Sequence, residues 1–130
     1  MPVLLLVGRV LFSAIFLAAA PRHFTAEAAA HASDLGVPLA SVAVPLSGVL
    51  AIAGGLSVLL GYQFRLGAWA LIAFLVPVTL MMHAFWRLDD PVAIRVQQGM
   101  FMKNVAMIGA ALVLSCVSPG PLSLDARLAP

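Results

Sequence analysis

Long stretches without a charged residue constrain this chain more than any other feature. Residues 35–64, 66–86 and 104–124 contain no Asp, Glu, Lys or Arg, and residues 2–20 contain only Arg9. A helix needs about 20 mostly apolar residues to cross the hydrocarbon core of a bilayer. The pattern therefore predicts four transmembrane helices, near residues 3–20, 42–61, 66–86 and 97–117.

The composition agrees with a membrane protein. Hydrophobic residues make up 63% of the sequence and charged residues 9%, whereas soluble domains average about 45–50% and about 25%. These values exclude a soluble globule, a disordered segment, a coiled coil and a nucleic-acid-binding arm. With 130 residues there is room for a single domain.

The connections between the apolar stretches set the topology. The short Tyr62–Arg65 connection predicts that the second and third helices are antiparallel neighbours. Asp90-Pro91 is typical of an N-cap followed by Pro at the first helical position, so the fourth helix is expected to run from Pro91 to about Val117. Residues 22–38 are expected to form an interfacial segment with a short helix. The predicted fold is an all-α, integral membrane, antiparallel four-helix bundle over residues 1–130.

Arg9 is the one charge inside the first predicted span, and ionisable groups at membrane depth are costly enough to be functional candidates. Its planar guanidinium is suited to holding an anionic or carbonyl-bearing ligand. Alternatively, Arg9 extends toward the nearby headgroups, close to Tyr62 and Gln63.

A second group of polar residues falls at the other membrane face. On a continuous helix, Thr79, His83 and Trp86 would form one stripe, with Lys103 and Asn104 at the same level of the next helix. Imidazole, ammonium, amide and indole groups together can bind a quinone head or another polar ring. The alternative is a hydrogen-bonded structural cluster that anchors the start of the fourth helix.

Neither a metal nor an intrinsic cofactor is expected. His23 and His83 from two helices suggest a bis-histidine haem site, but His23 follows Pro21-Arg22 at a helix end, where its position is poorly fixed. No Asp/Glu cluster accompanies the histidines, and the single cysteine, Cys116, excludes a thiol pair. The remaining ligand candidate is a quinone.

Small residues indicate where helices pack closely. Ser47, Ala51 and Gly55 recur every four residues and give one face of the second helix small side chains. Such a face lets another helix approach, either within the bundle or across a subunit boundary.

These residues together resemble the DoxX family of small four-helix membrane proteins, over nearly the whole chain. The most specific part is His83-Ala84-Phe85-Trp86, then Asp90-Pro91, then Phe101-Met102-Lys103-Asn104, which is similar to the family signature H-x-F-W…D-P…F-x-K-N. Gly8-Arg9 and Gly54-Gly55-Leu56 also match. One departure is Ala51, which stands about where many members carry a Glu that would be the natural partner of Arg9.

The resemblance implies a function in a bacterial or archaeal cytoplasmic membrane. The family takes its name from a subunit of a membrane thiosulfate:quinone oxidoreductase, and other members are thought to scaffold redox or detoxification assemblies. The expected role is therefore a non-catalytic anchor or accessory component of a quinone-linked redox complex, with other subunits or further copies of the chain as partners. The alternative is a stand-alone quinone-binding or small-molecule-binding protein, or an enzyme, that uses Arg9, His83, Lys103 and Asn104.

Overall fold

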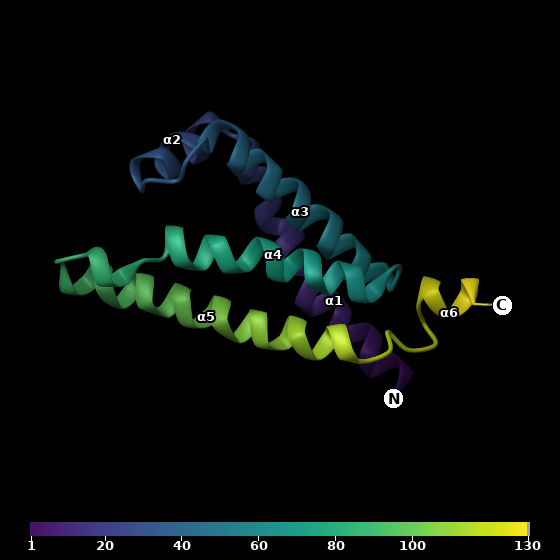
Figure 1. Ribbon diagram of the computed structural model, residues 1–130. Helices are drawn as coiled ribbons and strands as arrows, with labels where there is room; N and C mark the ends of the chain where they lie inside the picture. Colours follow the sequence, from purple (N-terminus) through teal and green to yellow (C-terminus); the bar gives the residue numbers. More distant parts are fainter. Residues whose placement is uncertain (130) are drawn as a thin grey trace.

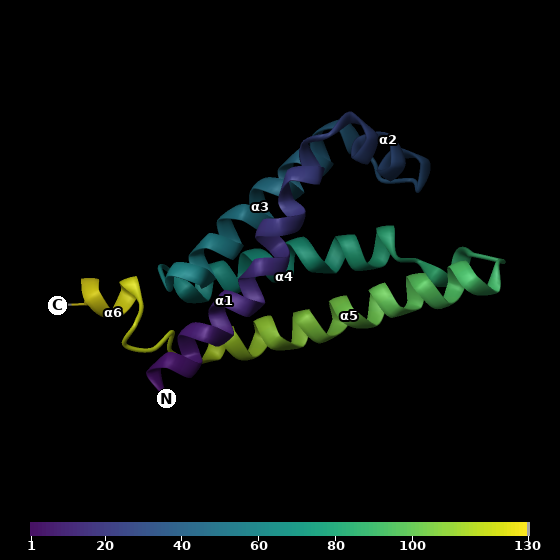
Figure 2. The same cartoon turned by 180° about the vertical axis from the view of Figure 1, so that it is seen from behind.

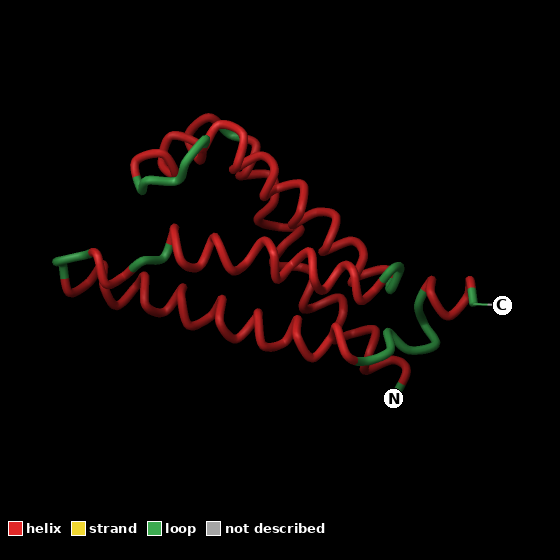
Figure 3. The backbone as a smooth tube through the Cα atoms, in the orientation of Figure 1, coloured by secondary structure: helices red, strands yellow, loops and turns green. Residues whose placement is uncertain are grey.

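The computed structural model describes residues 1–129. They form helices joined by short loops, and this part of the chain contains no strand (Figures 1 and 3). Four of the helices are long and apolar enough to cross a membrane. The elements in chain order are α1 (Pro2–Ala19), η1 (Ala20–Phe24), α2 (Ala26–Asp34), α3 (Ala40–Leu60), α4 (Phe64–Met82), η2 (Phe85–Arg87), α5 (Pro91–Cys116) and α6 (Leu124–Leu128).

The predicted all-α membrane fold is confirmed, and most helix limits lie close to those expected. The carboxylate of Asp90 accepts a hydrogen bond from the backbone N–H of Ala93 at 2.8 Å, with Pro91 at the first helical position. Thr25 caps α2 in the same way, accepting from the N–H of Ala28 at 3.2 Å. Side-chain caps of this kind satisfy donors that have no partner within the helix.

The prediction of a helix continuing to residue 86 is wrong. Helix α4 ends at Met82, and a separate 3-10 turn holds Phe85 and Trp86. Their rings pack edge-on against Phe101 of α5, with centroids 5.5 and 5.7 Å away. These contacts accompany a backbone that leaves the helical path at His83, so Thr79, His83 and Trp86 do not form one helical stripe.

The long helices pack in a series in which α1 lies on α3, α3 on α4, and α4 on α5. Helices α3 and α4 converge at the turn that joins them and diverge toward their other ends, as both views show (Figures 1 and 2). The bundle is therefore a wedge, open at the end where α2 and the start of α3 face the end of α4.

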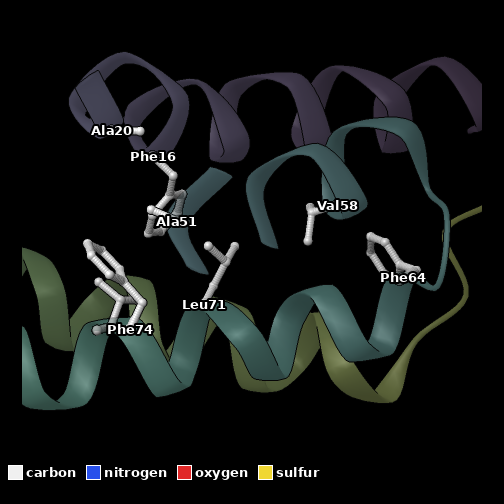
Figure 4. Close-up of a cluster of buried hydrophobic side chains, with 8 residues drawn as sticks. Phe16, Ala20, Ala51, Val58, Phe64, Leu71 and Phe74 are labelled. Carbon is white, nitrogen blue, oxygen red and sulfur yellow. The ribbon is translucent and has the colours of Figure 1, made fainter. Parts of the chain in front are cut away.

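The hydrophobic core fills the narrow part of this wedge (Figure 4). Phe16 of α1 packs edge-on against Phe74 of α4, with ring centroids 6.1 Å apart, and Leu71 is fully buried. Gly54 allows α3 to approach α4, because an added Cβ would lie 2.8 Å from the Leu71 side chain and 3.0 Å from the Gly67 carbonyl oxygen. The core thus depends on small residues of α3 as much as on large ones of its neighbours.

The segment after α5 turns back to the narrow end of the wedge. The N–H of Asp125 donates to the carbonyl of Gly61 at 2.8 Å. Its carboxylate accepts from the N–H groups of Gln63, at 2.9 Å, and Phe64, at 3.1 Å. Asp125 therefore supplies a cap for α4 from a residue some sixty positions away in the sequence.

Candidate functional site

A cavity of about 530 Å³ occupies the open end of the wedge. It lies between the α2 and α3 side of the bundle and the α4 and α5 side, and all three histidines of the sequence contribute to its wall. Its polar lining residues are Arg22, His23, His31, Ser47, His83 and Gln97. Proline, valine, alanine and methionine side chains complete the wall, so a few polar groups converge on an otherwise apolar space.

His23 is fixed on one side of the cavity by the start of α3. Nδ1 of His23 lies 2.8 Å from Oγ of Ser47, and that hydroxyl also lies 2.6 Å from the carbonyl oxygen of Val44, to which it donates. The ring packs against Phe74, with centroids 5.4 Å apart. Gly48 leaves room for His23 to lie against α3, because a Cβ at residue 48 would lie 2.7 Å from the His23 Cβ.

His83 is fixed on the opposite side by α5. It is the C-cap of α4, and its Nδ1 lies 2.7 Å from Oε1 of Gln97. Both side chains are about half-buried and line the cavity. The histidine thus joins the end of one membrane helix to the first turns of the next.

The other residues of the predicted polar group lie away from this cavity. Lys103 is exposed, with its ammonium 3.5 Å from the Met100 sulfur, and Asn104 is buried. Trp86 belongs to the aromatic cluster with Phe85 and Phe101 and is half exposed. Thr79 is buried and donates to the Leu75 carbonyl at 2.6 Å. Of the five residues predicted for this membrane face, His83 alone is part of the cavity wall.

Arg9 lies at the other end of the bundle, where it holds the segment after α5. Its guanidinium donates to the carbonyl of Pro119 at 3.1 Å and to the carbonyl of Leu122. The side chain is buried, 3% exposed. Within residues 1–129, the Arg9 Nε and the Ser13 Oγ are the buried side-chain atoms without a hydrogen-bond partner. Backbone carbonyls are thus the acceptors of Arg9, and its guanidinium lies next to Gly61 at the end of α3, ten positions after Ala51.

The small-residue face of α3 lies against the N-terminal part of the chain. Ser47 contacts His23, Ala51 is buried in the core, and a Cβ at Gly55 would lie 3.0 Å from the Leu17 side chain. This face therefore packs within one chain, against α1 and η1.

Sequence reasoning did not find Arg22, His31 or Gln97 as cavity residues. His31 lies on α2, which folds back over the start of α3. Gln97 lies two turns into α5, beside His83. A usable signal for Gln97 was its place on the part of α5 that precedes the apolar stretch, where a polar side chain faces the end of α4.

Comparison with known proteins places this fold in a family. The DoxX family model matches residues 4–84. The chain is 28% identical to the inner membrane protein YphA of Escherichia coli, over 97% of this chain and 91% of YphA. It is 30% identical to the inner membrane protein YqjF of the same organism, over 95% of this chain and 90% of YqjF.

No solved structure matches the chain in the corresponding search. The two relatives are inner membrane proteins, and four helices here are able to cross a membrane, so the expected multi-pass location in a cytoplasmic membrane is confirmed. The match to the family model covers more than half of the residues, and the family resemblance noted in the sequence is confirmed with it. This chain belongs to the DoxX family.

Proposed function

We propose that this protein binds a small ring compound of the quinone class in the histidine-lined cavity and serves as a non-catalytic component of a membrane redox complex. The observation that carries the proposal is the convergence of His23, His83, Arg22 and Gln97 on one mostly apolar cavity. Cavities of about 300–1,000 Å³ with apolar walls and a few placed polar groups are typical of small-molecule sites.

The walls support a flat, partly apolar ligand. Pro77 and Val78 form part of one wall, and Met81 and Met82 continue it toward His83. Methionine side chains are flexible and polarizable, so they adapt to the faces of a ring. A quinone combines an apolar ring with oxygen atoms at its edge, which matches apolar walls and polar groups at separate places.

The geometry of the nearest nucleophile supports binding rather than catalysis. Ser47 and His23 are within hydrogen-bond distance, as in a nucleophile–base pair. However, the Ser47 hydroxyl donates its proton to the Val44 carbonyl, so His23 is not placed to remove it. This argues for a component that holds a ligand for a partner rather than one that transforms it alone.

Binding is tested with the purified protein in lipid nanodiscs. We expect saturable binding of a short-chain quinone probe, oxidised or reduced, beyond its partition into empty nanodiscs, and at least fivefold weaker binding of the reduced probe by His83→Phe. Asn104→Leu is the matched control, because Asn104 is buried on α5 outside the cavity wall, and its affinity should stay within twofold of the wild type. Absence of saturable binding to the wild-type protein would refute the proposal.

The accessory role in a complex is tested separately. Gentle solubilisation from native membranes, followed by size-exclusion chromatography and mass spectrometry, should recover a defined oxidoreductase partner in constant ratio. Recovery of the chain alone, with its quinone still bound, would favour the alternative of a stand-alone binding protein.

A further inference from the structure

Resting on the proposed function, we infer that the cavity binds the reduced, hydroxyl-bearing form of its ring ligand more tightly than the oxidised, carbonyl form. The hydrogen bonds of His23 and His83 leave the same kind of atom on each ring available to the ligand. That atom is a bare imidazole nitrogen, which accepts a hydrogen bond and cannot donate one.

The tautomer of His23 follows from the hydrogen bonds of Ser47. A hydroxyl carries one proton, and that of Ser47 goes to the Val44 carbonyl oxygen at 2.6 Å. The Ser47 oxygen can therefore only accept from His23, so Nδ1, 2.8 Å away, carries the ring proton. In the neutral imidazole Nε2 is then unprotonated.

The tautomer of His83 follows from Gln97. Nδ1 of His83 lies 2.7 Å from the amide oxygen of Gln97, and an amide oxygen only accepts. Nδ1 therefore donates, and Nε2 of His83 is unprotonated as well. Neither Nε2 belongs to the buried side-chain atoms without a partner, which leaves both accessible to a molecule in the cavity.

The remaining polar groups do not oppose this preference. Arg22 and the amide NH₂ of Gln97 are donors, and they can bind an oxygen of either form, because a hydroxyl oxygen also accepts. His31 is exposed and lines the outer part of the wall. A hydroxyl therefore finds both acceptors and donors in this cavity, whereas a carbonyl oxygen placed at either Nε2 would face a lone pair.

The magnitude follows from one or two hydrogen bonds. Leaving a polar group in a binding site without its partner lowers affinity by about tenfold. We expect a short-chain 1,4-hydroquinone to bind at least tenfold more tightly than the matching benzoquinone. The hydroquinone dimethyl ether keeps the ring and the oxygens but has no O–H, so it should bind as weakly as the benzoquinone.

The test is anaerobic calorimetry of the full chain in nanodiscs with these three probes, at about pH 8, where an ordinary histidine is neutral. His83→Phe keeps a ring and removes the acceptor, so it should weaken hydroquinone binding by about tenfold and leave benzoquinone binding within threefold. Gln97→Leu frees the His83 tautomer, so Nε2 can carry the proton, and the preference for the hydroquinone should fall even if His83→Phe does not fold. Asn104→Leu serves again as the control that keeps the wild-type preference.

The outcomes separate the two proposals. Equal affinity for hydroquinone and benzoquinone, or an unchanged preference in Gln97→Leu, would overturn the assignment of the reduced form while ring binding stands. If none of the three probes binds saturably, the proposed function itself is wrong, and the preference falls with it.

Discussion

Replacement of Arg9 by Met tests whether the buried guanidinium holds the end of the chain in place. Methionine has nearly the length of the arginine stem and keeps the helix, but it cannot donate to the carbonyls of Pro119 and Leu122. We expect the segment after α5 to detach from α1 and from the turn between α3 and α4, while the cavity at the far end remains intact.

The size of the effect can be worked out from these two hydrogen bonds. A hydrogen bond from a charged donor contributes about 1.5–3 kcal/mol net, and the Arg9 side chain is almost wholly buried. Water replaces part of the lost interaction once the segment detaches, so the lower end of the range applies to each bond. The free energy of unfolding should fall by about 3 kcal/mol.

Unfolding in mixed micelles by titration with dodecyl sulfate measures this change, and tryptic cleavage at Arg127 reports local detachment. Arg65→Met is the matched control, because Arg65 is exposed and its loss should alter stability by less than about 0.5 kcal/mol. If Arg9→Met unfolds like the wild type and Arg127 stays equally resistant to trypsin, the guanidinium does not hold this segment.

Three further predictions concern the cap, the small-residue face and Asn104. Asp125→Ala should cost about 1–2 kcal/mol, because two N–H groups at the start of α4 lose their acceptor, and Asp125→Asn should cost about half as much; both are measured by the same titration. Ala51→Leu should destabilise the bundle by about 1–3 kcal/mol through overpacking, whereas Ala53→Leu on the exposed side of α3 should not; a thermal shift equal for both would contradict the packing. Asn104→Leu should lower thermal stability, since the amide is buried, and a protein of unchanged stability would remove any structural role for this amide.

Much of the fold was predictable because a lipid bilayer restricts which residues a membrane-spanning helix can contain. A charge inside an apolar stretch is expensive in lipid, so the intervals without charge mark the spans closely. The local signal at Asp90-Pro91 located the start of α5, because a capping side chain bonds to N–H groups two or three residues away. These features depend on residues that are neighbours along the chain.

The site was harder to predict because its contacts join distant parts of the chain. Helical periodicity predicted that Trp86 shares a face with His83. In the structure Trp86 instead packs against Phe101, which lies on α5 and is distant in sequence. Gln97 lines the cavity because α5 begins beside the end of α4, and its position before the apolar stretch does not by itself identify His83 as its partner. Likewise the acceptors for Arg9 are backbone carbonyls. Every residue type has a backbone carbonyl, so the sequence does not indicate which residues accept from Arg9.

The link between Arg9 and Leu122 spans 113 residues and has a consequence for biosynthesis. A ribosome adds about 5–20 residues per second, so roughly 6 to 23 seconds separate the synthesis of the guanidinium from that of its acceptors. During this interval the Arg9 guanidinium lacks the two carbonyl acceptors that it has in the folded chain. This end of the bundle is therefore completed last, after all four long helices have been synthesised.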